Sequence, residues 1–129
     1  MKILIADDEP DVQIILKKML GVYGNCVVCS DGEETFNEFK KSLVNEDYFD
    51  LICLDISMPK LTGREALVKI RDAEKSHGIT DGAKIIMITA HSNIDNFSSS
   101  FTEGCEAFLP KPFDREQLVN NLKILKLIE

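Results

Sequence analysis

Three acidic residues, a threonine and a lysine lie just past short apolar runs of this chain. The runs and the residues that follow them are Lys2–Ala6 with Asp7 and Asp8, Leu51–Leu54 with Asp55, Ile85–Ile88 with Thr89, and Ala107–Leu109 with Lys111. In an open parallel sheet, ligands and chemistry collect outside the carboxyl ends of the strands. Side chains just past each strand can therefore converge although they lie far apart in sequence. This is the layout that a phosphorylatable aspartate needs.

The residue types indicate how such a site would work. Carboxylates that crowd together raise one another's pKa unless a cation neutralises them. Mg²⁺ suits that need, because it takes one or two carboxylates and leaves positions for water and phosphate oxygens. With Mg²⁺ bound, Asp55 would attack a phosphoryl group and form an aspartyl phosphate. Lys111 would place a positive charge near the phosphoryl oxygens, and the Thr89 hydroxyl would donate a hydrogen bond to them.

Each of these residues also has an ordinary structural explanation. The acidic run Asp7-Asp8-Glu9 would favour the dipole of a following helix by about 0.3–1 kcal/mol per charge. A lysine alone at a strand end is commonly a solvated charge, and a threonine alone is commonly a strand or turn residue. Only the joint placement of the acidic run with Asp55 and Lys111 favours the chemical interpretation.

The elements that must position these residues follow from local patterns. Short apolar or β-branched runs predict five strands: Ile3–Ala6, Cys26–Ser30, Phe49–Leu54, Lys84–Ile88 and Ala107–Leu109. Apolar residues at helical spacing predict five helices, which begin at Pro10 and Asp31, span Arg64–Lys75 and Ser92–Glu103, and begin again at a cap on Asp114. The segment Ser92–Glu103 is poor in strong helix formers and is the weakest of these helices.

Alternation of five strands with five helices indicates an α/β protein with a parallel sheet covered on both faces. We expect a flavodoxin-like, doubly wound sheet of order 2-1-3-4-5. Its switch point falls between the first and third strands, so Asp7, Asp8 and Asp55 should meet there. Thr89 and Lys111 would join them from the fourth and fifth strands.

Composition limits the possible functions. A chain of 129 residues with 44% hydrophobic residues suits one globular domain. The formal charge of −7 disfavours direct binding to nucleic acid. No apolar stretch approaches the ~20 residues of a membrane span, and the N-terminus lacks the pattern of a signal peptide. We therefore expect a cytoplasmic protein.

The chain resembles the receiver domain of two-component response regulators, and is similar to the single-domain chemotaxis regulators. The residues that carry the resemblance are Ala6-Asp7-Asp8-Glu9, Leu54-Asp55-Ile56-Ser57-Met58-Pro59 with Gly63, Ile88-Thr89-Ala90, and Phe108-Leu109-Pro110-Lys111-Pro112-Phe113. The resemblance implies that Asp55 accepts a phosphoryl group from a phosphohistidine of a sensor histidine kinase or histidine phosphotransfer protein. It implies Mg²⁺ held by Asp8, Asp55 and the backbone carbonyl of Ser57, with Asp7 acting through water, and a cis Lys111-Pro112 peptide.

The same resemblance implies a signalling switch. Thr89 would move toward the phosphoryl group, and Phe108 would rotate into the vacated space. The surface of the fourth helix, fifth strand and fifth helix would then change for an unknown downstream protein. On this interpretation residues 1–129 are a single receiver domain without an output domain, a monomer or a phosphorylation-dependent weak dimer. The only reactions would be self-phosphorylation and autodephosphorylation.

Other classes fit the residues less well. A dehalogenase-type phosphatase needs a second acid two residues after its nucleophile, where this chain has Ser57. A flavodoxin needs a phosphate-cradling first loop, which acidic residues would repel. Cys26 and Cys29 would point to opposite faces of a strand, so we expect them to fill the core, and His91 is a candidate titrating group near the site. The remaining alternative is a receiver-like module that binds partners without phosphorylation.

Overall fold

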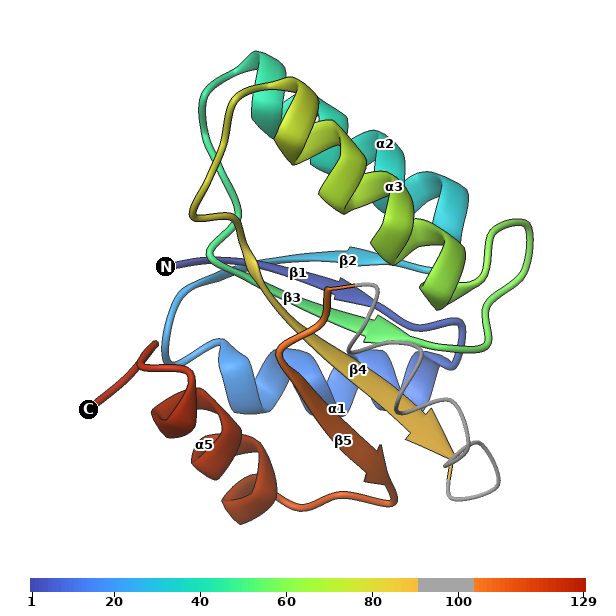
Figure 1. The fold of residues 1–129 in the computed structure, drawn as a ribbon. Coiled ribbons are helices and arrows are strands. Elements are labelled where there is room, and N and C mark those ends of the chain that lie inside the picture. The colour runs from blue at the N-terminus through green and yellow to red at the C-terminus, as the bar shows by residue number, and fades with distance from the viewer. Residues whose placement is uncertain (91–103) are drawn as a thin grey trace.

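A computed structural model of the chain describes residues 1–90 and 104–129, in which five strands and four helices follow one another (Figure 1). The elements are β1 (Lys2–Ala6), α1 (Pro10–Leu20), β2 (Asn25–Cys29), α2 (Gly32–Val44), β3 (Leu51–Asp55), α3 (Gly63–Ser76), β4 (Lys84–Ala90), β5 (Ala107–Lys111) and α5 (Arg115–Ile124). The helix predicted over Ser92–Glu103 and the residue His91 lie outside the described residues. None of the described helices is long and apolar enough to cross a membrane.

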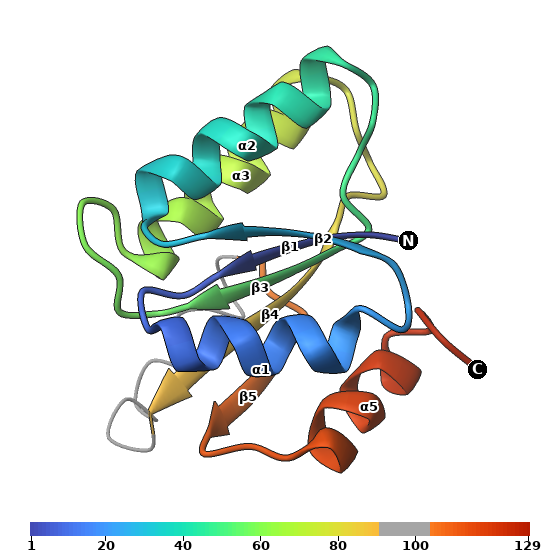
Figure 2. The same cartoon turned by 180° about the vertical axis from the view of Figure 1, so that it is seen from behind.

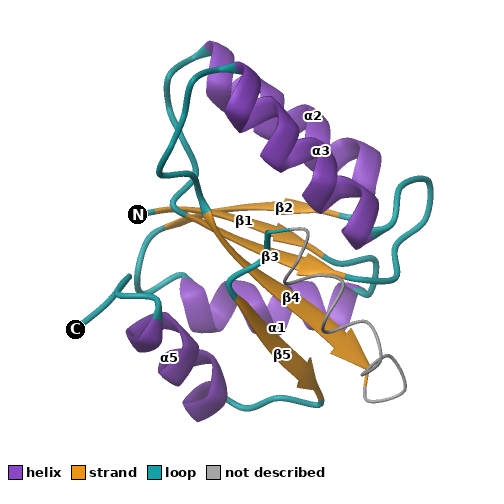
Figure 3. Ribbon diagram, viewed as in Figure 1, coloured by secondary structure: helices purple, strands orange, loops and turns teal. Residues whose placement is uncertain are grey.

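The strands form one parallel sheet of order β2-β1-β3-β4-β5, which confirms the predicted doubly wound order. Helices α1 and α5 cover one face of the sheet and α2 and α3 cover the other (Figures 1 and 2). Figure 3 shows the resulting three layers, with the sheet between two pairs of helices. The carboxyl ends of all five strands therefore lie along one edge of the molecule.

Two apolar clusters hold the layers together, one on each face of the sheet. Residues along β3 alternate between them: Leu51 and Cys53 pack on the α1 and α5 side, while Ile52 and Leu54 pack on the α2 and α3 side. All five residues of β3 are buried, as expected for a central strand covered on both faces. Cys26 and Cys29 contact opposite clusters and are free thiols, as their spacing predicted.

Two strands extend further than the sequence pattern indicated. β4 continues through Thr89 to Ala90, and β5 continues to Lys111. Parallel pairing explains the extension, because Thr89 pairs with Pro110 and Ala90 pairs with Lys111. Thr89 and Lys111 are therefore part of their strands, at the carboxyl end of the sheet. The apolar runs predict instead that both residues lie just past the ends of these strands.

Side-chain caps explain where three helices begin. Asp31, Thr62 and Asp114 each accept a hydrogen bond from the backbone N–H three residues later, at the starts of α2, α3 and α5. The cap predicted at Asp114 is thus confirmed. Helix α1 differs, because its N-cap residue Glu9 makes no side-chain cap and Pro10 occupies the first turn. The side chain of Glu9 is therefore available for another contact.

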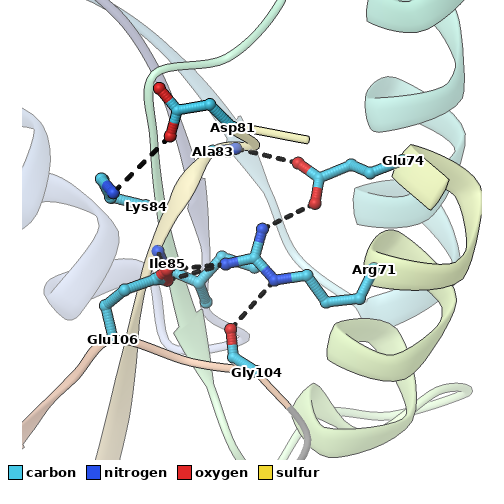
Figure 4. A network of polar contacts seen from close by, with 8 residues as sticks. All are labelled: Arg71, Glu74, Asp81, Ala83, Lys84, Ile85, Gly104 and Glu106. Carbon is cyan, nitrogen blue, oxygen red and sulfur yellow. Dashed lines mark hydrogen bonds and ion pairs between the residues drawn. The ribbon is translucent and has the colours of Figure 1, made fainter. Parts of the chain in front are cut away.

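A polar network joins α3 to the amino ends of β4 and β5 (Figure 4). Asp55 and Lys111 are the last residues of β3 and β5 and lie at the opposite end of the sheet. The Arg71 guanidinium donates to the carboxylates of Glu74 at 2.6 Å and Glu106 at 2.7 Å, and to the Gly104 carbonyl at 2.9 Å. Glu74 also accepts from the Ala83 N–H at 2.8 Å. The network anchors the chain where it enters β4 and β5.

Candidate functional site

Lys111 brings together side chains from three separate parts of the chain. Its ammonium nitrogen lies 2.9 Å from Glu9 Oε1, 3.0 Å from Asp7 Oδ2 and 3.5 Å from Asp55 Oδ2. Asp7 follows β1, Asp55 ends β3 and Lys111 ends β5, so the parallel sheet explains why residues far apart in sequence meet. The convergence of the first, third and fifth strand ends is as predicted.

Four carboxylates cluster at this site, and three of them pair with Lys111. Asp7, Asp8, Glu9 and Asp55 each offer an oxygen that lies within 4.8 Å of the others, with Asp7 and Asp55 buried and the other two exposed. Asp7 Oδ2 is buried and has no hydrogen-bond partner among the described residues. Lys111 lies at ion-pair distance from it without hydrogen-bond geometry. An all-oxygen donor set with an unsatisfied buried oxygen fits a hard divalent cation such as Mg²⁺.

Burial and crowding change the acidity of the site. Burial, and next the negative charge of Asp7, raise the pKa of Asp55 to about 7, although Lys111 and the Ser57 N–H act in the opposite direction. Burial also raises the pKa of Asp7. Burial alone would lower the pKa of Lys111, but the nearby carboxylate oxygens of Glu9 and Asp7, together with the charges of Asp55 and Asp7, outweigh it and raise that pKa. The cluster therefore has more negative charge than one lysine neutralises.

Backbone contacts fix the two central carboxylates. Asp7 Oδ1 accepts a hydrogen bond from the Glu9 N–H at 2.8 Å, and Asp55 Oδ1 accepts one from the Ser57 N–H at 3.2 Å. Gly63 packs on the backbone of Asp55 so closely that a Cβ there would lie 2.1 Å from the Asp55 carbonyl oxygen. Only glycine fits this position, which explains its place in the motif around Asp55.

The other predicted site residues differ in their distance from the carboxyl edge of the sheet, since Thr89 lies near the end of β4 and Phe108 is the second residue of β5. Thr89 is buried, and its hydroxyl donates to the Ala90 carbonyl at 3.1 Å. Phe108 is half-buried in β5 and packs against the cluster on the α2 and α3 side. Ser57 is exposed and lies two residues after the end of β3. The Lys111-Pro112 peptide is cis, as the resemblance implied.

Sequence reasoning did not give Glu9 a role in the site. The sequence pattern indicates only a charge that favours the helix dipole, whereas the Glu9 carboxylate makes the shortest ion pair of Lys111. The available signal was its position, as the third acid in succession after a strand whose end was already predicted to lie near a lysine.

Comparison with known proteins identifies the family. Residues 3–123 match the response regulator receiver domain, and the chain belongs to this family. Over its whole length it is similar to the chain solved in the CheX-CheY-BeF3-Mg²⁺ complex of Borrelia burgdorferi, with 27% identity, a TM-score of 0.83 and 90% of that chain covered. It is also similar to chemotaxis protein CheY4 of Vibrio cholerae, with 26% identity, a TM-score of 0.79, and coverage of 95% of this chain and 96% of that one.

The chain also matches parts of longer proteins. It is 30% identical to the transcriptional regulatory protein CpxR of Escherichia coli over 125 residues, which cover 96% of this chain and 48% of CpxR. It is 31% identical to the probable histidine kinase 2 of Oryza sativa over 129 residues, which cover 92% of this chain and 12% of the kinase. The chain thus spans half or less of the length of these relatives.

Proposed function

We propose that this receiver domain is a phosphorylation-activated signalling switch that accepts a phosphoryl group on Asp55. The observation that carries the proposal is the position of this side chain. It is only 5% exposed, it ends the central strand β3, and its Oδ2 lies 3.5 Å from the Lys111 ammonium. The family membership and the surrounding acidic cluster support the same conclusion.

The phosphoryl donor would be a phosphohistidine on a sensor histidine kinase or a histidine phosphotransfer protein. A carboxylate oxygen of Asp55 attacks phosphorus, a P–O bond forms, and the P–N bond breaks with its electron pair left on the imidazole nitrogen. Lys111 stabilises the charge on the phosphoryl oxygens. Later attack by water restores Asp55 and releases inorganic phosphate, so the chain would act on itself and would not turn over an external substrate.

Mg²⁺ is the metal that we propose for the acidic cluster. Asp8, Asp55 and the Ser57 carbonyl would hold it directly and Asp7 would act through water. When bound, it would offset the negative charge of the cluster and of the phosphoryl oxygens. The donor set supports this assignment, as does the presence of Mg²⁺ with BeF3 in the similar Borrelia complex.

The phosphoryl donor would approach from the α1 side. Val12 and Ile15 on α1 form an apolar pocket with Pro112 and Phe113, and Lys111 lines its edge. A helical partner seated on this pocket would bring its histidine next to Asp55.

A cytoplasmic location is also part of this proposal, because the phosphoryl group that a kinase transfers comes from ATP.

The output would pass through Thr89, Phe108 and the face that includes β5 and α5. The Thr89 hydroxyl would exchange its bond to the Ala90 carbonyl for one to the phosphoryl group. Phe108 has no hydroxyl, so packing alone would hold its inward position. We propose a downstream protein as the reader of this face, with the chain a monomer or a weak phosphorylation-dependent dimer.

Intact-mass measurement tests the proposal. Wild type, Asp55→Asn and the control Asp81→Asn are incubated with Mg²⁺ and acetyl phosphate. A gain of one phosphoryl group is expected for wild type and Asp81→Asn and not for Asp55→Asn. No gain in wild type, together with no binding of beryllium fluoride, would contradict the proposal and favour a module that binds partners without phosphorylation.

A further inference from the structure

Glu9 makes a contact with Lys111 that its position in the chain does not require. Its Oε1 lies 2.9 Å from the Lys111 ammonium, closer than the oxygen of Asp7 at 3.0 Å or that of Asp55 at 3.5 Å. The Glu9 side chain is 60% exposed, whereas those of Asp7 and Asp55 are buried. The resting lysine is therefore shared with an acid at the surface of the site.

The ordinary role of an acid at this position does not explain the contact. Glu9 is the N-cap residue of α1, yet its side chain caps no backbone N–H of the helix. Its own N–H is satisfied by Asp7 Oδ1. The carboxylate is instead directed to Lys111, which lies 102 positions away in the sequence.

A phosphoryl group on Asp55 would compete for the same ammonium. Lys111 has three N–H donors, and the phosphoryl group would add new acceptor oxygens beyond Asp55 Oδ2. The ammonium now lies nearer to Glu9 and Asp7 than to Asp55, so its movement onto the phosphoryl oxygens would lengthen one of those two contacts. Asp7 is fully buried, so the loss of its neighbouring positive charge would be costly. Glu9 is exposed, so water can replace the lysine at little cost.

We propose that Glu9 is a positioning residue that holds Lys111 away from Asp55 in the resting state and thereby weakens the hold of the site on a phosphoryl group. The inference rests on the proposed function, because it assigns Glu9 a regulatory effect at the same site. Lys111 would then pair with Glu9 in the resting state and with the phosphoryl oxygens in the phosphorylated state.

The first test measures binding of beryllium fluoride at saturating Mg²⁺ by NMR titration. Glu9→Gln keeps the size of the side chain and removes its charge, so Lys111 is released. We expect the dissociation constant to fall about two- to fivefold, as the loss of one exposed ion pair implies. The matched control is Asp11→Asn, which removes an exposed charge from α1 that is not paired with Lys111 and should leave the constant unchanged.

The second test uses metal-free protein. A double-mutant cycle of Glu9→Gln and Lys111→Met compares urea midpoints in EDTA. Glu9→Gln should lower the urea midpoint when Lys111 is present, because the ion pair is lost. It should not lower the midpoint in the Lys111→Met background. Additive midpoint shifts would overturn the proposal.

Three results of the titration would also overturn the inference. These are an unchanged constant in Glu9→Gln, an equal shift in Asp11→Asn, which would indicate a general charge effect, or a loss of Mg²⁺ affinity in Glu9→Gln, which would make Glu9 a metal ligand. If wild type binds no beryllium fluoride at all, the proposed function fails. If wild type binds it and Glu9→Gln binds it equally, only this inference fails.

Discussion

At the scale of one residue, the carboxylate proposed as phosphoacceptor, Asp55, lowers the stability of the folded protein. Its carboxylate is nearly buried and lies in a cluster with Asp7, while a single lysine contacts both. Burial and like charge both disfavour the ionised form, which is the form that would attack phosphorus. A bound cation would favour the ionised carboxylate. Metal-free protein should therefore have a lower free energy of unfolding.

The first prediction concerns the pH dependence of that cost. The pKa of Asp55 is raised from 3.8 to about 7 in the folded protein, so the folded state binds more protons than the unfolded state between those values. Stability from this group is therefore lost as the pH rises through that window. Without metal, Asp55→Asn should be more stable than wild type at pH 8, by an amount of the order of 2–4 kcal/mol.

Urea unfolding in EDTA checks this prediction. The advantage of Asp55→Asn should shrink steadily as the pH falls from 8 toward 4. The exposed Asp81→Asn serves as the control and should show no such trend. An equal advantage of Asp55→Asn at pH 8 and pH 5 would mean that the ionised carboxylate does not cause it.

At the scale of an element, the junction of β3 and α3 controls where Asp55, the proposed phosphoacceptor, lies. The Gly63 N–H donates to the Ile56 carbonyl at 2.8 Å, which folds the start of α3 back onto the end of β3. Thr62 and Glu65 then cap α3 reciprocally. The position of Asp55 therefore depends on a close backbone contact as well as on the strand.

The second prediction is that Gly63→Ala displaces this junction. A Cβ would lie 2.1 Å from the Asp55 carbonyl oxygen, and the backbone has to move. We expect a loss of about 1–3 kcal/mol in the free energy of unfolding and weaker phosphoryl uptake by intact mass. Gly78→Ala is the control, because that position has a φ of +79° but open space. It should cost about 1 kcal/mol with uptake unchanged.

The third prediction concerns the network at the other end of the sheet (Figure 4). Arg71→Met would leave Glu74, which is 5% exposed, and Glu106 without their shared cation. Because the pairs are partly buried, we expect a loss of about 2 kcal/mol in urea unfolding. Asp81→Asn breaks the exposed pair with Lys84 in the same region and should cost less than about 0.5 kcal/mol. Similar losses in both variants would show that the network does not anchor β4 and β5.

At the scale of the whole molecule, the network around Arg71 and the proposed phosphorylation site lie at opposite ends of the sheet. The amino ends of β4 and β5 are tied to α3 by Arg71, while the carboxyl ends hold the acidic cluster and Lys111. The formal charge of −7 adds to the negative potential around that cluster. A divalent cation should therefore stabilise the folded chain as a whole.

The fourth prediction is that Mg²⁺ raises the thermal midpoint and that EDTA reverses the effect. Mass action predicts that Mg²⁺ adds about 2.7 kcal/mol to the free energy of unfolding when its concentration is 100 times its dissociation constant. Asp8→Asn removes an exposed member of the cluster and should lose most of the effect, whereas Asp11→Asn should keep it. Equal stabilisation of both variants by Mg²⁺ would place the metal elsewhere.

Local sequence patterns were sufficient to predict the order of the elements and the edge of the sheet where the acidic cluster lies. Apolar runs and helical spacing are local properties, so they located the five strands and the helices α1, α2, α3 and α5 to within a few residues. The rule that parallel strands share a carboxyl edge then brought Asp7, Asp55 and Lys111 together. Extension of β4 through Thr89 was missed, because pairing between neighbouring strands continued beyond the apolar run.

Only the tertiary structure decided which side chains meet. The ion pair of Glu9 with Lys111 spans 102 positions, and that of Arg71 with Glu106 spans 35. No local pattern encodes such contacts, because they depend on how helices pack on the sheet and on which direction each side chain takes. The complete burial of Asp7 has the same origin, since its exposure is set by neighbours from other elements.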